Sequence, residues 1–286
     1  MPQVVKILLA YLTKFLIYIL SYSLSEINIG LLIYMIRNKK INFLTDKSFI
    51  KRVSSGKWEN HTLDIIDSFA NKEHILLDIG AWNGITTLYG ASDYKKVVAI
   101  EADPKAIEKF KKNVGVNDFT NIILINKAIS DRNGLAEFGG NGGFGNSEST
   151  LLVSDEGFIK EGGEKTRGRS INSEDYRGKQ KTQVETIEPS FILQYLTDPV
   201  GLIKMDIEGG EKIVIPAMKE MLTKLRSPLL LSLHWVYLKN KDIDNILNYL
   251  FKIYEVCYDD QRKRTLDKQS ILDKKISTVL FTYYTI

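Results

Sequence analysis

The stretch Ile75-Leu-Leu-Asp-Ile-Gly-Ala-Trp-Asn-Gly-Ile-Thr-Thr87, followed at a short distance by Val97-Val-Ala-Ile-Glu101, decides the fold. The first apolar run passes through Asp78 into a glycine turn, and the second ends at Glu101. A strand, a glycine turn, a helix and a second strand form the unit of a parallel sheet that binds an adenosine-containing cofactor at its carboxyl edge. The acid that ends the second strand is placed to accept hydrogen bonds from two ribose hydroxyls.

The turn indicates which cofactor is bound. Its glycines, Gly80 and Gly84, follow a G-x-x-x-G spacing, with Trp82 between them, whereas a nicotinamide fold uses G-x-G-x-x-G to bring a pyrophosphate onto a helix N-terminus. Asp78 would repel a pyrophosphate and suits a ligand with sulfonium and ammonium groups, which S-adenosylmethionine has. The residues predicted to contact this cofactor are Asp78, Gly80, Ala81, Asn83, Gly84, Glu101, Ala102, Asn126 and Asp206.

Composition limits the class of protein. The chain has 286 residues and a net charge of only +4, which is too weak to imply nucleic acid as a partner. Cys257 is the one cysteine, so no disulfide forms within the chain, and a reducing, cytoplasmic compartment is expected. Three histidines leave few candidates for metal binding or acid–base chemistry.

The amino-terminal stretch 4–36 is strongly apolar and is followed by a basic segment. Glu26 and Asn28 interrupt the run of about 20 apolar residues that a membrane-spanning helix needs. Three alternatives stay open: a helical pair packed on the domain, an interfacial helix that contacts a membrane surface, and a membrane anchor. We expect a helical extension over residues 1–58, candidate for membrane association, and a Rossmann-like domain over residues 59–286.

The rest of the chain continues the strand-and-helix pattern. We expect a strand at Ile122–Ile125 that ends at Asn126, where the adenine ring would lie. The glycine-, serine- and charge-rich segment 131–181 is predicted to be an insertion with short strands that lies on the substrate side, with a disordered loop as the alternative. Two strands follow each other at the carboxyl end with only a basic turn between them, which predicts an antiparallel pair. The fold class is therefore α/β, with a seven-stranded, mostly parallel sheet, an antiparallel carboxyl-terminal strand and helices on both faces.

The predicted fourth strand ends in charges. Alternation places Lys204, Asp206 and Glu208 on one side of the segment 201–211. His234 lies near the carboxyl end of the next strand, predicted over 229–235. Because such charges need partners or water, we expect them at the ligand edge, with His234, Asp206 and Lys204 as candidate catalytic residues. A buried ion pair between Lys204 and Asp206 is the alternative.

Together these motifs resemble the FkbM family of S-adenosylmethionine-dependent methyltransferases over about residues 60–240. The segment 78–84 is similar to the first family motif, 98–101 to the second, 126–130 to the third, and Lys204-Met-Asp-Ile-Glu-Gly-Gly-Glu211 to the most characteristic signature. The resemblance implies a Rossmann-like methyltransferase that acts on hydroxyl oxygens of sugars, glycolipids or natural products. The chain departs from the family at Ser232, where an acid is common.

The predicted function is therefore O-methylation of a small-molecule, glycan or lipid acceptor, with His234 or Asp206 as the base. A divalent cation held by Asp206 and Glu208 is an alternative way to lower the hydroxyl pKa, although no second set of ligands is visible. Two rival functions stay open: a non-catalytic scaffold that binds S-adenosylmethionine, and a nicotinamide-dependent reductase.

Overall fold

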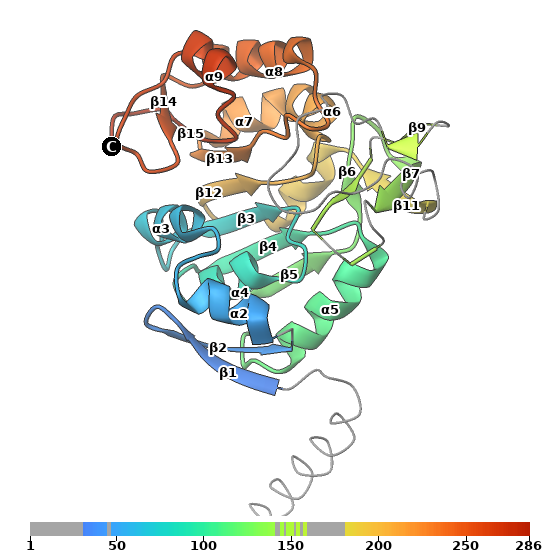
Figure 1. Ribbon diagram of the computed structural model, residues 1–286, viewed down its shortest axis with the longest axis vertical. Coiled ribbons are helices and arrows are strands. Elements are labelled where there is room, and N and C mark those ends of the chain that lie inside the picture. Colours follow the sequence, from blue (N-terminus) through green and yellow to red (C-terminus); the bar gives the residue numbers. More distant parts are fainter. Residues whose placement is uncertain are drawn as a thin grey trace, which may run out of the picture.

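The centre of the computed structural model is a seven-stranded sheet in the order β14-β15-β13-β12-β3-β4-β5 (Figure 1). The structure describes residues 31–44, 47–140, 144–145, 147–151, 153–154, 157–158 and 181–286. The strands of this sheet are β3 (Ile75–Ile79), β4 (Lys96–Ile100), β5 (Ile122–Ile125), β12 (Val200–Met205), β13 (Leu229–Ser232), β14 (Val256–Asp259) and β15 (Thr278–Thr282). Strand β15 runs antiparallel to β13 and β14, and the other strands share one direction. The predicted mostly parallel sheet is confirmed.

Helices cover both faces of the sheet because its central strands are apolar on both sides. In β3, Leu76 packs on one face, and Ile75 and Leu77 pack on the other, and all three are fully buried. The first face carries α2 (Lys47–Ser54), α3 (Asn60–Ser68), α4 (Ile85–Ala91) and α5 (Pro104–Gly115), and the second carries α6 (Glu211–Ala217), α7 (Lys219–Leu225), α8 (Asn240–Ile253) and α9 (Lys268–Lys274). A 3₁₀ helix, η1 (Pro189–Tyr195), precedes β12. Burial of each such leucine or isoleucine contributes about 1.5–3 kcal/mol.

The amino-terminal part differs from the helical extension that we expected. Strands β1 (Leu31–Ile36) and β2 (Lys39–Leu44) form an antiparallel hairpin beside α2 and α5 (Figure 1). Arg37, in the hairpin turn, takes a left-handed φ of 58° and pairs with Asp67 of α3 at 2.8 Å. An unbroken apolar run does not distinguish a strand from a helix, and here the turn at Arg37 makes the hairpin. The helical prediction is wrong over residues 31–44.

The membrane contact predicted for residues 4–36 concerns residues that mostly lie outside the described ranges. Only 31–36, which form β1, are described. None of the helices in the described ranges combines the length and the apolar character needed to cross a lipid bilayer.

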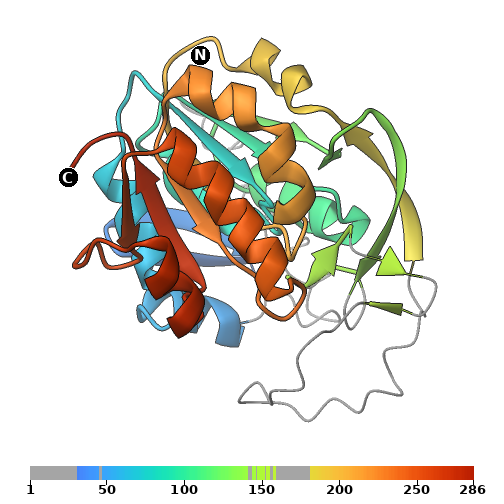
Figure 2. The ribbon, with the colours of Figure 1, turned by 90° about the horizontal axis from the view of Figure 1, so that it is seen from above.

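The described part of the segment 131–181 forms small sheets at one end of the main sheet (Figure 2). Its first sheet has the order β6-β11-β7-β8, and β9 and β10 form a separate pair. These strands are β6 (Ala128–Ile129), β7 (Gly134–Gly140), β8 (Ser149–Thr150), β9 (Val153–Ser154), β10 (Gly157–Phe158) and β11 (Lys181–Ile187). Short strands within this segment are thereby confirmed, while residues 159–180 lie outside the described ranges.

Two details near the carboxyl end correct the sequence-based expectation. The short helix α9 lies between β14 and β15, where we expected only a basic turn. The antiparallel pairing nevertheless holds, because β15 returns between β13 and β14. Strand β13 ends at Ser232, so His234 lies in the loop beyond it and not within the strand.

Candidate active site

A cavity of about 480 Å³ opens at the carboxyl ends of the central strands. Its size lies within the range of about 300–1,000 Å³ typical of small-molecule sites. The ends of β3, β4, β12 and β13 line it, together with the insertion and the segment that joins α2 to α3. The insertion is fixed to the sheet through Asp103, whose carboxylate accepts hydrogen bonds from Gly145 N at 2.7 Å and from the Ser149 hydroxyl.

The turn after β3 requires glycine at both predicted positions. Gly80 has a φ of 78°, and a Cβ atom there would lie 1.8 Å from the carbonyl oxygen of Asp206. Gly84 has a φ of 88°, and its Cβ would meet the ring of Phe110 at 2.3 Å. Lys204 Nζ also donates to Gly80 O at 2.8 Å. The ends of β3 and β12 therefore approach too closely to admit any side chain at Gly80.

Trp82 has a structural role that its position in the turn did not suggest. It takes a left-handed φ of 49°, and its backbone N–H donates to Glu101 Oε2 at 2.7 Å. Its ring packs edge-on against Phe49 of α2, with centroids 5.2 Å apart. The other oxygen of Glu101 accepts from Asp103 N at 2.6 Å. Burial raises the pKa of Glu101 to about 7, although these two hydrogen bonds oppose the rise.

Asp78 lies behind the cavity wall and not on its surface. Its side chain is fully buried, and it accepts hydrogen bonds from the hydroxyls of Thr86 and Thr87, each at 2.7 Å. Lys204 Nζ lies 3.2 Å from its other oxygen. Its carboxylate fixes Lys204 and the first turn of α4, and Asp78 is outside the cavity lining, so a cofactor contact of Asp78 stays a prediction.

The remaining predicted cofactor residues divide into two groups. Those that line the cavity are Gly80, Ala81, Glu101, Ala102 and Asp206. Asn83, Gly84 and Asn126 are outside its lining. Asn126 Nδ2 donates to the backbone oxygen of Glu101 at 3.0 Å, so its amide supports the end of β4.

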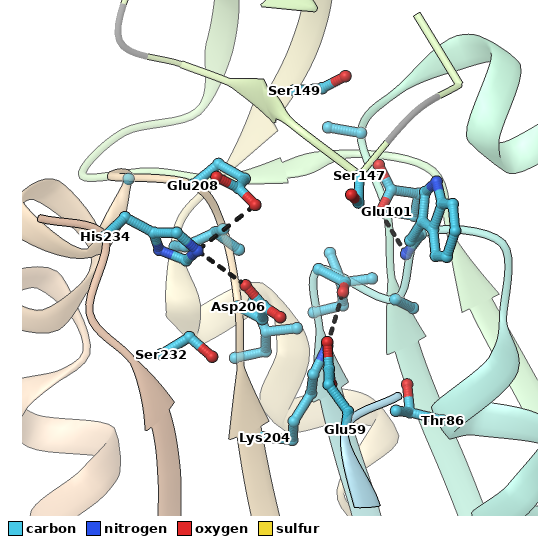
Figure 3. A pocket seen from close by; sticks show the side chains of 18 of the residues that line it. Glu59, Thr86, Glu101, Ser147, Ser149, Lys204, Asp206, Glu208, Ser232 and His234 are labelled. Carbon is cyan, nitrogen blue, oxygen red and sulfur yellow. Dashed lines mark hydrogen bonds and ion pairs between the residues drawn. The ribbon is translucent and has the colours of Figure 1, made fainter. Parts of the chain in front are cut away.

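The second half of the cavity holds a cluster around His234. Its Nε2 lies 3.1 Å from Asp206 Oδ1 and 3.4 Å from Glu208 Oε1, and its Nδ1 lies 2.8 Å from Glu211 Oε1. Figure 3 shows Asp206, Glu208 and His234 turned toward one another across the cavity from Glu101. Glu208 takes a left-handed φ of 52° and lies beyond β12, which ends at Met205. The alternation of side chains along a strand therefore does not determine its direction. A local turn directs it toward His234.

The charges of this cluster shift one another's pKa values. Burial alone would lower the pKa of His234, but its three carboxylate neighbours, Glu211 foremost, raise it well above its ordinary value. Burial raises the pKa of Glu208. For Asp206 burial acts in the same direction, but the hydrogen bond with His234 and the charge of Lys204 lower its pKa to about 2. The predicted catalytic histidine and the carboxylate therefore form one coupled unit.

Lys204, the third predicted catalytic residue, lines the cavity but is held in place. Burial would lower its pKa, yet Asp78, Asp206 and Glu59 together raise it. Its bonds to Gly80 O and Asp78 make it a fixed cation that joins the two halves of the cavity. The sequence left open a buried ion pair between Lys204 and Asp206. In the structure the direct ionic partner of Lys204 is Asp78 instead.

Sequence reasoning missed several residues of the site. Phe49, Arg52 and Trp58 line the cavity from the segment that precedes the predicted domain, and Glu59 lines it from the first residue of that domain. Glu59 is accessible through the open side of the cavity, but protein atoms surround its carboxylate, and this partial desolvation and the charge of Asp206 raise its pKa to about 7. No pattern in residues 49–59 indicates this role. Glu211 could have been selected from the sequence, because it is the last residue of the quoted signature. Its contact with His234 could not be predicted and is seen only in the structure.

The first half of the cavity fits S-adenosylmethionine. The turn at Gly80 brings backbone close to the ligand, and the acid at the end of β4 faces the cavity. The apolar side chains of Ala102, Ala128 and Phe138, all buried and part of the lining, form a slot suited to a flat base. Three features define the class of Rossmann-like methyltransferases. They are a parallel sheet with one antiparallel strand, a glycine turn at the end of one strand, and an acid at the end of the adjacent strand.

Comparisons with known proteins identify the family. The model of the methyltransferase FkbM domain matches residues 78–265, so the chain belongs to this family. The chain is 35% identical over 68 residues to the uncharacterized protein MJ1452 of Methanocaldococcus jannaschii, a match that covers 24% of this chain and 26% of that relative.

Solved structures of methyltransferases resemble the chain only distantly. The methyltransferase FkbM from Methylobacillus flagellatus has 14% sequence identity and a TM-score of 0.43, and the match covers 74% of this chain and 44% of that one. A TehB-like SAM-dependent methyltransferase from Corynebacterium glutamicum has 11% identity and a TM-score of 0.41, with coverage of 82% and 94%. The fibrillarin of Aeropyrum pernix, solved with bound S-adenosyl-L-methionine, has 10% identity and a TM-score of 0.36, with coverage of 74% and 66%.

Proposed function

We propose that the protein methylates a hydroxyl oxygen of a small-molecule, glycan or lipid acceptor, such as a sugar, a glycolipid or a natural product. One observation carries this proposal: a single cavity joins the glycine turn and Glu101 to the cluster of Asp206, Glu208 and His234. When bound, S-adenosylmethionine supplies a methyl group on a positively charged sulfur that an oxygen nucleophile can displace. The residues on the two sides of the cavity then have separate tasks.

The cofactor side binds and orients. Glu101 has two carboxylate oxygens that each accept one backbone amide, which leaves lone pairs for ribose hydroxyls. Lys204, fixed by Asp78, holds the carbonyl of Gly80 and so the shape of the turn. These groups are in place before any ligand arrives, so little conformational entropy is lost on binding.

The acceptor side activates the hydroxyl. A sugar hydroxyl is a weak acid, so it must lose its proton to a positioned group as the new bond forms. Asp206 and His234 line the cavity within 3.1 Å of each other, and Glu208 completes the cluster at 3.4 Å from His234. The proposed role of this unit is to accept that proton.

The entrance on this side suits a polyhydroxylated ligand. Ser232, Ser277 and Thr278 line the cavity beside His234 and can exchange hydrogen bonds with hydroxyl groups. Trp235 and Val236, which are half-buried and exposed, add apolar surface. The indole N–H of Trp235 donates to Ile276 O at 3.0 Å, so the ring is fixed and can pack against the apolar face of a sugar.

The test is to incubate the purified full chain with methyl-labelled S-adenosylmethionine and separate extracts of glycans, polar lipids and small metabolites. We expect label in a hydroxylated product, in a linkage that resists mild base as a methyl ether does. A His234→Ala variant is the matched control and should label the same fraction far more weakly. Label found only as a base-labile ester, or only in protein or nucleic acid, would overturn the proposal.

A further inference from the structure

The inference concerns the space between Asp206, Glu208 and His234. Each of these residues directs one ligand atom toward the others, and no two of the three atoms are more than 4.8 Å apart. All three side chains line the active-site cavity. Unlike a cluster of surface acids, this set contains an imidazole nitrogen and is only about one-fifth exposed, with fractional side-chain exposures of 24%, 17% and 17%.

Glu211 fixes the orientation of the imidazole ring. Its carboxylate is fully buried, and its Oε1 lies 2.8 Å from His234 Nδ1. A carboxylate accepts only, so Nδ1 carries the proton and donates it. Nε2 then faces Asp206 and Glu208, at 3.1 Å and 3.4 Å, and in the neutral ring its lone pair points between them. A carboxylate that holds the far side of a histidine ring in this way is the usual outer partner of a metal-binding histidine.

The carboxylates of Asp206 and Glu208 both face Nε2 of His234, and all three groups are acceptors unless a proton or a cation lies between them. A positive charge is therefore needed at this place. If that charge is a proton, the cluster contains one imidazolium and three carboxylates, from Asp206, Glu208 and Glu211, which gives 1 − 3 = −2. If it is a divalent cation beside a neutral imidazole, the sum is 2 − 3 = −1. Lys204 also lies close enough to lower the pKa of Asp206, but the charge of its direct partner Asp78 cancels its own, so the pair leaves this difference unchanged. The divalent cation leaves less uncompensated charge in a buried place.

The distances also fit a metal. With metal–ligand bonds of about 2.1 Å, separations of 3.1 and 3.4 Å correspond to ligand–metal–ligand angles of about 95° and about 108°. These angles lie between octahedral and tetrahedral values. Because all three side chains line the cavity, the positions that they leave open on a cation would face the cavity.

From this geometry we propose that Asp206, Glu208 and His234 form a binding site for one divalent first-row metal cation. Two carboxylates and one imidazole are ligands that such ions accept together, and Mn²⁺ is a suitable probe. Under the proposed function, on which this second step rests, the acceptor hydroxyl occupies an open position of the cation, which lowers the hydroxyl pKa. As the oxygen–methyl bond forms and the sulfur–methyl bond breaks to leave S-adenosylhomocysteine, the hydroxyl proton passes to a carboxylate oxygen that does not bind the cation, Asp206 Oδ2 or Glu208 Oε2.

The test uses the full chain, stripped of metal with a chelator and titrated with Mn²⁺, with bound ion measured by the loss of the free-ion electron paramagnetic resonance signal. We expect one ion per chain. Glu208→Gln and His234→Ala should each weaken Mn²⁺ binding at least about tenfold, since even outer partners of metal ligands contribute about 10–100-fold. Glu59→Gln, which removes a carboxylate from the same cavity outside the cluster, should change the affinity by less than about threefold.

Binding of S-adenosylhomocysteine to the same variants, measured by calorimetry, shows that they are folded and separates the two proposals. The metal site is overturned if the wild-type chain binds no Mn²⁺, or if Glu208→Gln and His234→Ala bind Mn²⁺ as the wild type does. This conclusion holds whether or not S-adenosylhomocysteine binds. If Mn²⁺ binds as expected but label from S-adenosylmethionine never reaches a hydroxyl, the metal site stands and O-methylation fails.

Discussion

The two halves of the cavity use carboxylates in opposite ways. On the cofactor side, Asp78 accepts from two threonine hydroxyls and pairs with Lys204, and Glu101 accepts from two backbone amides. On the acceptor side, the carboxylates of Asp206, Glu208 and Glu211 converge on a single imidazole. On the cofactor side, each of the two carboxylates has its own hydrogen-bond donors. On the acceptor side, three carboxylates share one imidazole, so negative charge is in excess.

This difference indicates separate functions. A carboxylate with fixed donors has a fixed position and charge, which suits tight binding of a ligand whose shape never changes. A cluster with excess negative charge attracts protons and cations, which suits a step in which the acceptor hydroxyl loses a proton. The first half should therefore control affinity for the methyl donor, and the second should control turnover.

The largest effect is expected at the point where the halves meet. In a Gly80→Ala variant the new Cβ would lie 1.8 Å from the Asp206 carbonyl oxygen, so β3 and β12 must separate. We expect a loss of about 3 kcal/mol or more in the free energy of unfolding, and no measurable binding of S-adenosylhomocysteine. Chemical denaturation and calorimetry measure both quantities. Gly115→Ala is the control, because no atom lies within 4 Å of its Cβ, and it should be neutral or slightly stabilising.

A Glu101→Ala variant tests the cofactor side alone. Loss of charged hydrogen bonds to two ribose hydroxyls, each worth about 1.5–3 kcal/mol, should weaken S-adenosylhomocysteine binding by about 100-fold or more. Calorimetry provides the affinity, and the melting temperature shows whether the turn at Trp82, which also bonds to Glu101, survives. Wild-type affinity in a folded variant would refute the ribose assignment.

His234→Ala is the converse experiment on the acceptor side. We expect turnover with the identified acceptor to fall by about 100-fold or more, which is the usual contribution of a positioned acid–base group. Affinity for S-adenosylhomocysteine should stay within about threefold of wild type, because Glu101 and the glycine turn are unchanged. Turnover that equals the wild-type value would remove His234 from the mechanism, and a parallel loss of donor affinity would show that the halves are not separate.

A further effect is a pH dependence of stability that belongs to the cofactor side. The pKa of Glu101 is raised from 4.5 to about 7 in the fold, so between these values the native state binds more protons than the unfolded chain. Its contribution to stability is complete below pH 4.5 and is lost as the pH rises through about 7. Without ligand, the wild-type chain should therefore lose on the order of 3 kcal/mol relative to Glu101→Gln between pH 4.5 and 8. Denaturant titrations at several pH values measure this difference, and parallel curves for the two proteins would contradict it.

Much of the fold could be predicted from local patterns. The strand Ile122–Ile125 forms as predicted, and Asp103 caps α5 by accepting from Lys105 N and Ala106 N at 2.8 and 2.9 Å. These features depend on neighbours within a few residues, so the sequence carries the information. The hairpin at 31–44 was not predicted, because the continuous apolar run 31–36, which forms β1, lacks the period that separates a strand from a helix.

The site was predicted in outline and corrected in detail. Glu101, Asp206 and His234 reach one cavity, as expected from strand ends that share one edge of a parallel sheet. Asp78 belongs to the same motif but lies behind the wall, because Thr86, Thr87 and Lys204 enclose its carboxylate. Which side of a strand end faces a cavity depends on residues far away in the chain.

The sequence by itself determined the strand, glycine turn, helix and strand of residues 75–101 and the acids at the strand ends, since spacing and residue type fix these locally. Only the tertiary structure decided that Glu211 orients His234 across 23 positions of the chain and that Phe49 and Trp58 line the cavity from outside the predicted domain. Side-chain partnerships across a fold depend on distances of a few ångströms between segments remote in sequence. Such distances are set by the packing of the whole core, and no local pattern records them.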